Sequence, residues 1–319
     1  MLKSVIFGLN LLLSTTFLFI NTSQANTQTA FDIEIKQTNG KTTTIDQLLQ
    51  TAPVYIKFWA TWCQDCLKQM PHFQHTHETY KNKLHVLSIN IWMNDSLEDI
   101  ANVVAKYQLS MPMGVDYTGE LKKAFNFVGT PYHLLIDQNR NIVHAGYKSD
   151  DRLDQKVAFI ATGKLESKHQ IALHEEKPGT LDREINRLIH NDTPTALLFV
   201  TTWCESYLKN SRPKQSKNCV DMQAWANKLQ HEQPQITWQT VVSRLWTGDS
   251  ELAQYKTRHQ LKMPASIDPS NTVFERFKVQ DFPTLILFND GKEITRATKM
   301  NSYNELLKEI KNYPVLRKH

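Results

Sequence analysis

Residues 58–66 read Phe-Trp-Ala-Thr-Trp-Cys-Gln-Asp-Cys, and this stretch decides the fold. It follows a short apolar run at 54–56 and precedes a segment of helical character at 67–70. A strand that delivers two cysteines to the first turn of a helix suits thiol chemistry, because the unpaired N–H groups and partial positive charge of a helix N-terminus favour a thiolate. Cys63 is therefore the predicted nucleophile, and Cys66 would close or resolve a disulfide with it. A zinc site is disfavoured, because the sequence holds no second Cys-x-x-Cys pair.

The stretch 58–66 resembles the active-site signature of thioredoxin-like proteins, most closely the periplasmic TlpA/ResA-like thiol–disulfide reductases. The second element of this family is a downstream proline, and Pro131 follows Cys63 by 131 − 63 = 68 residues. The resemblance implies that Pro131 is cis, that it lies against the disulfide, and that Thr130 presents its backbone to a bound substrate. It also implies that Cys63 is the more exposed and more acidic cysteine. Trp62 is expected mainly to pack and shield the site, and it joins Thr130 and Pro131 as a candidate for substrate docking.

Lys57 stands where thioredoxin carries a buried aspartate beneath the disulfide. The group that accepts the proton of Cys66 is therefore left open by the resemblance. Related proteins are expected to use a nearby glutamate, and Asp95 and Glu98 are the candidates in this chain. Asp65, between the cysteines, disfavours a thiolate by like-charge repulsion, which opposes a very strongly oxidising pair.

Residues 1–25 are typical of a cleavable secretory signal peptide. Lys3 supplies the positive n-region, residues 5–20 form an apolar h-region, and residues 23–25 give a small-x-small cleavage site. We expect the mature chain to begin near Asn26, to be soluble and to work in the periplasm, an uncleaved membrane anchor being the alternative. The 4 cysteines of such an exported chain suit two redox pairs better than a disulfide scaffold.

Charge and composition limit the partners. The formal net charge of +5 comes from interspersed lysines and arginines and not from a basic stripe, so nucleic acid is not expected as a partner. His72, His75 and His77 could indicate copper. However, only an i, i+3 pair of them shares a helix face, and such pairs usually have no function. We therefore predict no cofactor and no resident metal.

Strands alternate with helices along residues 26–163, which predicts an α/β domain with a central mixed β-sheet flanked by helices. Asn39-Gly40 is expected to turn a hairpin built from residues 31–35 and 41–45. We expect later strands at 84–91, 111–115, 134–136 and 142–145. We expect helices at 67–82 with a kink at Pro71, at 96–107 and at 153–162. The polar stretch 164–180 is interpreted as a linker.

Residues 181–319 repeat the pattern of the first unit. Three segments recur: 196–204 matches 56–63, 258–264 matches 106–112, and 281–284 matches 128–132. The prolines at 112 and 131 and those at 264 and 283 are each separated by 19 residues. Two copies of a thioredoxin-like fold are therefore expected, the second one degenerate.

The two copies differ where the chemistry lies. Tyr207 stands where the second cysteine would be, so Cys204 cannot form the usual active-site disulfide. A basic insertion at 209–219, expected to be a loop, carries Cys219 at a distance of 219 − 204 = 15 residues. The two sulfurs could meet at little extra entropic cost. They could form a second redox pair with Cys204 as nucleophile, a static disulfide, or two free thiols.

These features predict an exported thiol–disulfide oxidoreductase that reduces disulfides in partner proteins through Cys63 and Cys66. Its partners would be disulfide-containing exported proteins and a membrane thiol electron donor, because the periplasm is oxidising. The second domain would relay electrons through Cys204 and Cys219 or hold a client. The alternatives are a disulfide-forming oxidase or isomerase, a non-enzymatic binding or chaperone module, and a copper-handling protein.

Overall fold

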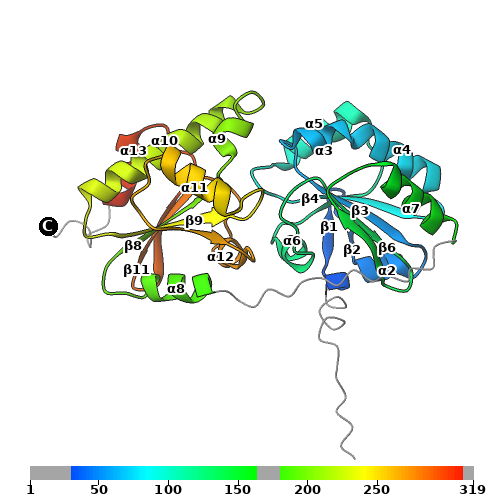
Figure 1. The fold of residues 1–319 in the computed structure, drawn as a ribbon, viewed down its shortest axis with the longest axis horizontal. Helices are drawn as coiled ribbons and strands as arrows, with labels where there is room; N and C mark the ends of the chain where they lie inside the picture. The colour runs from blue at the N-terminus through cyan, green and yellow to red at the C-terminus, as the bar shows by residue number, and fades with distance from the viewer. Residues whose placement is uncertain (1–29, 164–179, 312–319) are drawn as a thin grey trace, which may run out of the picture.

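The computed structural model of the protein describes residues 30–163 and 180–311. These segments form two α/β units side by side, here called the first domain (30–163) and the second domain (180–311) (Figure 1). The predicted signal peptide lies outside the described residues, and so does the predicted linker except for Thr180. Within the two described segments, no helix combines the length and the apolar character needed to cross a bilayer.

The first domain is built on a seven-stranded mixed sheet in the order β2-β1-β5-β4-β3-β6-β7. Its strands are β1 (Ile35–Gln37), β2 (Thr42–Thr43), β3 (Val54–Trp59), β4 (His85–Asn90), β5 (Met113–Val115), β6 (Tyr132–Ile136) and β7 (Ile142–Gly146). β3 pairs parallel with β4 and antiparallel with β6, and all its residues are buried. The apolar stretch before the cysteines is thus the centre of the sheet, which fixes the position of the turn that follows it.

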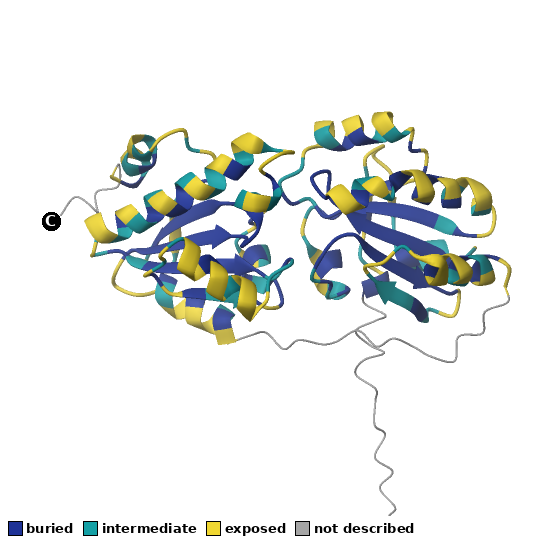
Figure 2. Cartoon of the chain, turned by 45° about the horizontal axis from the view of Figure 1, so that its top comes forward, coloured by how far each residue is buried: buried dark blue, intermediate teal, exposed yellow. Residues whose placement is uncertain are grey.

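Helices surround this sheet and turn their exposed residues outward (Figure 2). They are α2 (Ile45–Leu49), α3 (Gln64–Lys68), α4 (Met70–Tyr80), α5 (Leu97–Tyr107), α6 (Glu120–Ala124) and α7 (Asp151–Ala161). The kink predicted at Pro71 is a break between α3 and α4 at Gln69, because a proline in the first turn lacks the N–H that would continue the earlier helix. Ser96 begins α5 as predicted, through a capping box with Asp99.

Two local predictions for the first domain need correction. The hairpin forms, with Gly40 at φ +83° in its turn, but its first strand is Ile35–Gln37 and not 31–35. Ile45 begins α2 instead of ending the second strand, because Thr44 and Gln47 make a capping box. Helix α6 was not predicted, because it is a single short turn.

The second domain holds a five-stranded sheet in the order β10-β9-β8-β11-β12. Its strands are β8 (Thr195–Val200), β9 (Thr237–Ser243), β10 (Ala265–Asp268), β11 (Thr284–Asn289) and β12 (Lys292–Ala297). Its helices are α8 (Thr180–Ile189), α9 (Cys204–Tyr207), α10 (Pro213–Glu232), α11 (Asp249–Arg258), α12 (Thr272–Arg276) and α13 (Tyr303–Lys311). Strand order and directions repeat those of β5-β4-β3-β6-β7 in the first domain.

The insertion predicted as a loop is mostly helical. Pro213 begins α10, a helix of 20 residues, and Cys219 lies inside it. Proline is well tolerated in the first turn of a helix. Met222, Ala226 and Leu229 are buried at helical spacing, so packing against the sheet holds this helix in place.

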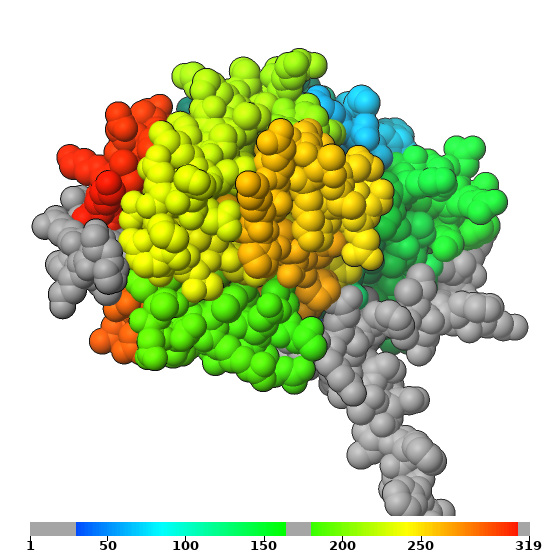
Figure 3. All heavy atoms as spheres, turned by 60° about the vertical axis from the view of Figure 1, so that its left-hand side comes forward, coloured from blue at the N-terminus to red at the C-terminus, as the bar shows by residue number. Residues whose placement is uncertain are grey.

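The core of the first domain continues into the second. One cluster of buried apolar residues includes Trp62 and Cys63 together with Trp203, Cys204 and Phe282 of the second domain. Figure 3, which brings the second domain forward, shows its yellow and orange atoms against the green and blue atoms of the first. The two domains therefore meet at the end of each sheet that carries the cysteines.

Candidate active site

The first pair of cysteines forms a disulfide at the end of β3. Cys63 is the N-cap of α3, and its Cα lies 5.2 Å from that of Cys66. The backbone N–H of Cys66 donates to Sγ of Cys63 at 3.2 Å. Once the disulfide is reduced, this N–H would stabilise a thiolate on Cys63, because a hydrogen bond to the charged form lowers the pKa of a thiol.

The loop before β6 has the predicted cis peptide bond between Thr130 and Pro131. Oγ1 of Thr130 is buried and has no hydrogen-bond partner in the described residues. Gly129 is needed for a close approach, because a Cβ at this position would meet Nε1 of Trp246 at 2.4 Å. The loop is thus packed against the second domain on one side.

A layer of buried polar side chains lies between β3 and α3. Nζ of Lys57 donates to the carbonyl oxygen of Cys66 at 3.1 Å, and burial lowers the pKa of Lys57 to about 7. His133, the register partner of Lys57 on β6, is hydrogen-bonded to Tyr55 at 2.8 Å and to Gln69 at 3.1 Å. Burial, and after it the positive charge of Lys57, lowers the pKa of His133 to about 3. His133 is therefore neutral, whereas Lys57 can change its charge near neutral pH.

The two acidic candidates for the proton acceptor lie elsewhere. Asp95 accepts hydrogen bonds from the backbone and hydroxyl of Thr61 at 2.8 and 2.6 Å and from Asn90 at 2.7 Å. Burial raises the pKa of Asp95, and these hydrogen bonds oppose the rise. Glu98 is exposed on α5. Asp95 thus holds the turn that precedes Cys63, and its role as an acceptor stays a prediction, as does that of Glu98.

Aromatic side chains of the second domain cover the disulfide. The ring of Trp62 lies 4.8 Å from that of Trp203 and 5.7 Å from that of Trp246. The backbone N–H of Gln64 donates to the hydroxyl oxygen of Tyr207 at 3.0 Å. Cys63 is fully buried as a result, so the expectation of an exposed nucleophile is wrong for this arrangement of the domains.

The contacts between the domains are nearly reciprocal. The N–H of Asn94 donates to the carbonyl of Gln280 at 2.9 Å, and the N–H of Trp246 donates to that of Val128 at 2.7 Å. Both pairs are related by a shift of 152 residues, since 94 + 152 = 246 and 128 + 152 = 280. The turn after β4 therefore binds the cis-proline loop of the second domain, and the turn after β9 binds that of the first domain. The two equivalent sites face each other.

The side chains of Asn94 and Arg212 make further contacts between the domains. The Asn94 side chain accepts from the N–H of Phe282 at 2.7 Å and donates to its carbonyl at 3.0 Å. Phe282 precedes the second cis proline, so the side-chain amide of Asn94 pairs with the backbone immediately before Pro283. Arg212, from the basic insertion, reaches across to Asp95 at 3.1 Å and also binds Thr61.

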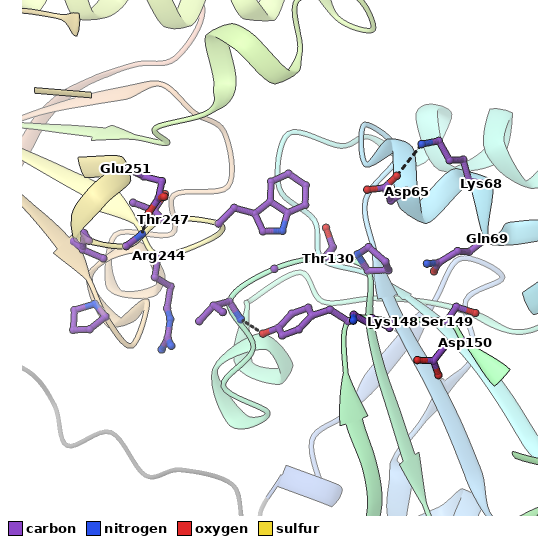
Figure 4. Close-up of a pocket in the computed structure, with 18 residues that line it drawn as sticks. Asp65, Lys68, Gln69, Thr130, Lys148, Ser149, Asp150, Arg244, Thr247 and Glu251 are labelled. Carbon is purple, nitrogen blue, oxygen red and sulfur yellow. Dashed lines mark hydrogen bonds and ion pairs between the residues drawn. The ribbon is translucent and has the colours of Figure 1, made fainter. Parts of the chain in front are cut away.

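A cleft of about 1050 Å³ opens between the domains (Figure 4). One wall comes from the first domain and includes Thr130 and Pro131 beside Asp65 and Lys68, which form an ion pair at 2.9 Å. The opposite wall comes from the second domain, and its residues are Arg244, Trp246, Thr247, Gly248, Glu251, Ile267 and Pro269. The cis-proline loop thus lines one wall of this cleft.

The second pair, Cys204 and Cys219, is also a disulfide, with Cα atoms 6.2 Å apart. The bond joins α9 to α10, and Tyr207 stands in the place of the missing cysteine. The alternative of two free thiols is therefore wrong.

The histidines do not gather at one point. Nε2 of His72 lies 3.3 Å from a carboxylate oxygen of Asp154. Among residues 30–163 and 180–311, no three His, Cys, Asp or Glu side chains lie close enough together to hold a metal ion.

Sequence reasoning missed the residues that join the domains, above all Asn94, Trp246 and Phe282. The signal was available in part, because the shift of 152 that relates Pro131 to Pro283 also relates Asn94 to Trp246. The repeat shows which positions are equivalent, but it does not show that the two sites face each other.

The fold and the site define a thioredoxin-fold domain with a disulfide-forming Cys-x-x-Cys pair. Residues 27–145 match the AhpC/TSA family. Among curated proteins, the thiol–disulfide oxidoreductase ResA of Bacillus thuringiensis subsp. konkukian is 31% identical over 112 residues, which are 34% of this chain and 62% of that protein. The thioredoxin-like protein YneN of Bacillus subtilis is 27% identical over 133 residues, 41% of this chain and 77% of that protein. The chain thus spans less than two thirds of the length of this ResA relative.

Two of the solved structures that resemble the chain each cover about two fifths of it. A secreted Mycobacterium tuberculosis disulfide oxidoreductase homologous to E. coli DsbE is 18% identical, with a TM-score of 0.36, over 41% of this chain and 97% of that one. StoA from Bacillus subtilis is 18% identical, also with a TM-score of 0.36, over 40% of this chain and 95% of that one.

Proposed function

We propose that the chain is an exported thiol–disulfide oxidoreductase whose first domain reduces disulfides in partner proteins through Cys63 and Cys66. The observation that carries the proposal is the Cys63–Cys66 disulfide at the end of β3, in a domain whose cis-Pro131 loop lines an open cleft. The names of ResA relatives support the reaction class.

In the proposed reaction, the reduced protein attacks a client disulfide with the thiolate of Cys63. One client sulfur leaves as a thiolate, and a mixed disulfide joins the client to Cys63. The thiolate of Cys66 then attacks Sγ of Cys63, which releases the second client thiolate and closes the Cys63–Cys66 bond. Two electrons pass to the client, and a membrane thiol donor would restore the dithiol in an oxidising periplasm.

We assign the second domain, proposed to be a degenerate thioredoxin-like copy, the role of a client-holding cover. Two observations support this role: Tyr207 and Trp203 bury the disulfide, and residues such as Arg244 and Glu251 form one wall of the cleft. A client would enter the cleft beside Pro131, and the aromatic contacts would part to expose Cys63. An electron relay through Cys204 and Cys219 is the second candidate, favoured by the placement of the two sites face to face.

The test is to trap the mixed disulfide. The Cys66→Ser variant, reduced and mixed with a folded protein that carries an accessible disulfide, should accumulate a covalent adduct on Cys63, identified by peptide mass. The matched control is Cys63→Ser, which should form no adduct. If neither variant forms an adduct, or if the adduct lies on Cys204, the proposal is wrong.

A further inference from the structure

Lys57 is a buried titratable side chain that is hydrogen-bonded to the backbone of the resolving cysteine, Cys66. Its side chain is fully buried in β3, and its Nζ is 3.1 Å from the carbonyl oxygen of Cys66. Nζ also lies 5.5 Å from the centre of the Phe73 ring. In the described part of the chain, Lys57 has no carboxylate within ion-pair distance. Burying a charged lysine without a counter-ion costs free energy. This cost favours the neutral amine and points to a role for it.

The second domain provides an internal comparison. Lys57 precedes Cys63 by six residues, and Leu198 precedes Cys204 by the same interval, since 63 − 57 = 204 − 198 = 6. The register partner of Lys57 is His133, whereas that of Leu198 is Leu285. The buried polar pair thus occurs where the Cys-x-x-Cys motif is complete. Where the motif has lost its second cysteine, two leucines fill the same places.

The proposed reaction requires a proton acceptor at this point. Cys66 is fully buried, and a buried thiol does not ionise readily because burial disfavours the thiolate. The carboxylate of Asp95 is engaged with Thr61 and Asn90, and Glu98 is exposed. Lys57 remains as the buried titratable group that is hydrogen-bonded to the backbone of Cys66.

We propose, on the basis of the proposed function, that the neutral amine of Lys57 accepts the proton of the Cys66 thiol when the mixed disulfide is resolved. The S–H bond of Cys66 breaks and an N–H bond forms on Nζ. The resulting thiolate attacks Sγ of Cys63, the client thiolate leaves, and the ammonium of Lys57 later returns its proton to that thiolate or to water. Electrons pass only between sulfurs, so no further oxidant or reductant is needed.

The electrostatics of the layer agree with this role. Burial lowers the pKa of Lys57 to about 7, so much of the amine is neutral near pH 7. The other titratable groups of this layer are His133 on β6 and Tyr55 on β3. His144 on β7 and His72 on α4 act on His133, and Asp154 on α7 acts on Tyr55. The pKa of His133 is held far below neutral, so His133 stays uncharged and does not act as a charged partner of Lys57.

A single-turnover reaction tests the proposal. The reduced Cys204→Ser/Cys219→Ser protein, mixed with excess dithiobis(nitrobenzoate), should release one coloured thiolate as Cys63 attacks and a second as Cys66 resolves. We expect the second phase to accelerate with pH through an inflection near 7. Lys57→Met should slow this phase about 100-fold at pH 7 and abolish the inflection, while the first phase stays unchanged. The unchanged first phase shows that the variant is folded.

Two further variants separate a proton acceptor from a fixed positive charge. Lys57→Arg keeps the charge but cannot give up its proton near neutral pH, so it should be as slow as Lys57→Met. Lys57→Glu supplies a different base and should restore the second phase, with the inflection moved. The matched control is Lys122→Met, which removes the other buried lysine of the described residues and should keep the inflection.

The proposal is overturned if Lys57→Met keeps a fast second phase with its inflection, or if Lys57→Arg resolves as fast as the unaltered lysine. It is also overturned if Lys57→Met slows both phases equally, as a purely structural role would. Dithiobis(nitrobenzoate) replaces the client, so the two-phase release can support Lys57 even if no protein disulfide is reduced. The proposed function would fail in that case, and the two failures are distinguishable.

Discussion

The first and second domains carry the same strand-to-helix turn, but only the first keeps a complete dithiol motif. In the first domain, the disulfide spans 3 residues within one helical turn, above a buried lysine. In the second, it spans 15 residues and joins α9 to α10, whose first turns lie in the insertion. Tyr207, three residues after Cys204, accepts a hydrogen bond from the backbone N–H of Gln64, next to Cys63. The second site thus contributes to covering the first.

This difference separates features that both domains share, which hold the loops in place, from the polar layer found beside the Cys-x-x-Cys motif alone. Both domains keep the cis proline and a tryptophan whose indole N–H donates to the carbonyl of the next turn, Trp62 to Met93 at 2.6 Å and Trp203 to Leu245 at 2.7 Å. These features hold the loops in place. The polar layer of Lys57 and His133 has no polar counterpart in the second sheet.

The largest expected effect comes from removing each cysteine pair in turn. Cys63→Ser/Cys66→Ser should reduce the rate of insulin disulfide reduction to that of the reductant alone, because no nucleophile remains. Cys204→Ser/Cys219→Ser should leave the rate close to that of the unaltered protein. An equal loss in both double variants would show that the second disulfide takes part as a relay.

The next effect concerns the pH dependence of stability. The pKa of Lys57 is lowered from 10.5 to about 7 in the folded oxidised protein. Between these values the unfolded chain holds a proton that the folded chain has released, so stability should rise with pH across this window. Lys57→Met should lose this rise, which is about 4 kcal/mol at most between pH 7 and 10.

Denaturant unfolding of the first domain at several pH values measures this effect. The control is Lys122→Met, whose curve should keep the part of the rise that belongs to Lys57. Parallel curves for Lys57→Met and the unaltered protein would contradict the lowered pKa, and with it the charge change on which the proton-acceptor role depends.

A smaller effect is expected from the second disulfide acting as a staple. Cys204→Ala/Cys219→Ala should lower the free energy of unfolding of the second domain by about 3 kcal/mol, because the bond closes a loop of 15 residues. Thermal unfolding followed by tryptophan fluorescence measures it. No change in stability would favour a labile, exchanging bond over a staple.

The smallest effect tests the contact between the sites. Asn94→Ala removes both hydrogen bonds to Phe282 and should favour separation of the two domains at this contact by about 1.4 kcal/mol. Cys63 of the reduced protein should then be alkylated about tenfold faster. Asn39→Ala, in the distant hairpin turn, is the matched control and should leave this rate unchanged. Equal alkylation rates in all three proteins would show that the second domain does not limit access to Cys63.

The sequence predicted much of the fold because its signals are local. The apolar run before Cys63, the Ser96 cap and the spacing of Pro131 each report on nearby backbone, and β3, α5 and the cis peptide bond are found where expected. The strand order of the second sheet agrees with the repeat seen in the residues.

The remaining features depend on contacts between distant segments. The burial of Cys63 arises from Trp203 and Tyr207, more than 130 residues away along the chain, and no local pattern reports such a contact. The insertion was misjudged because its first residues are polar and include Pro213, although the buried spacing of Met222 and Ala226 continues the helix. The low pKa of Lys57 likewise follows from burial that only the folded chain creates.

A redox titration of the protein in glutathione buffers, with thiols trapped and all four cysteines mapped by mass, tests the central claim most directly. A reductase requires a low reduction potential for Cys63–Cys66, near or below about −230 mV, where reducing thioredoxin-type proteins lie. A value near about −120 mV, typical of a strong oxidant, would contradict the claim and favour a disulfide-forming enzyme.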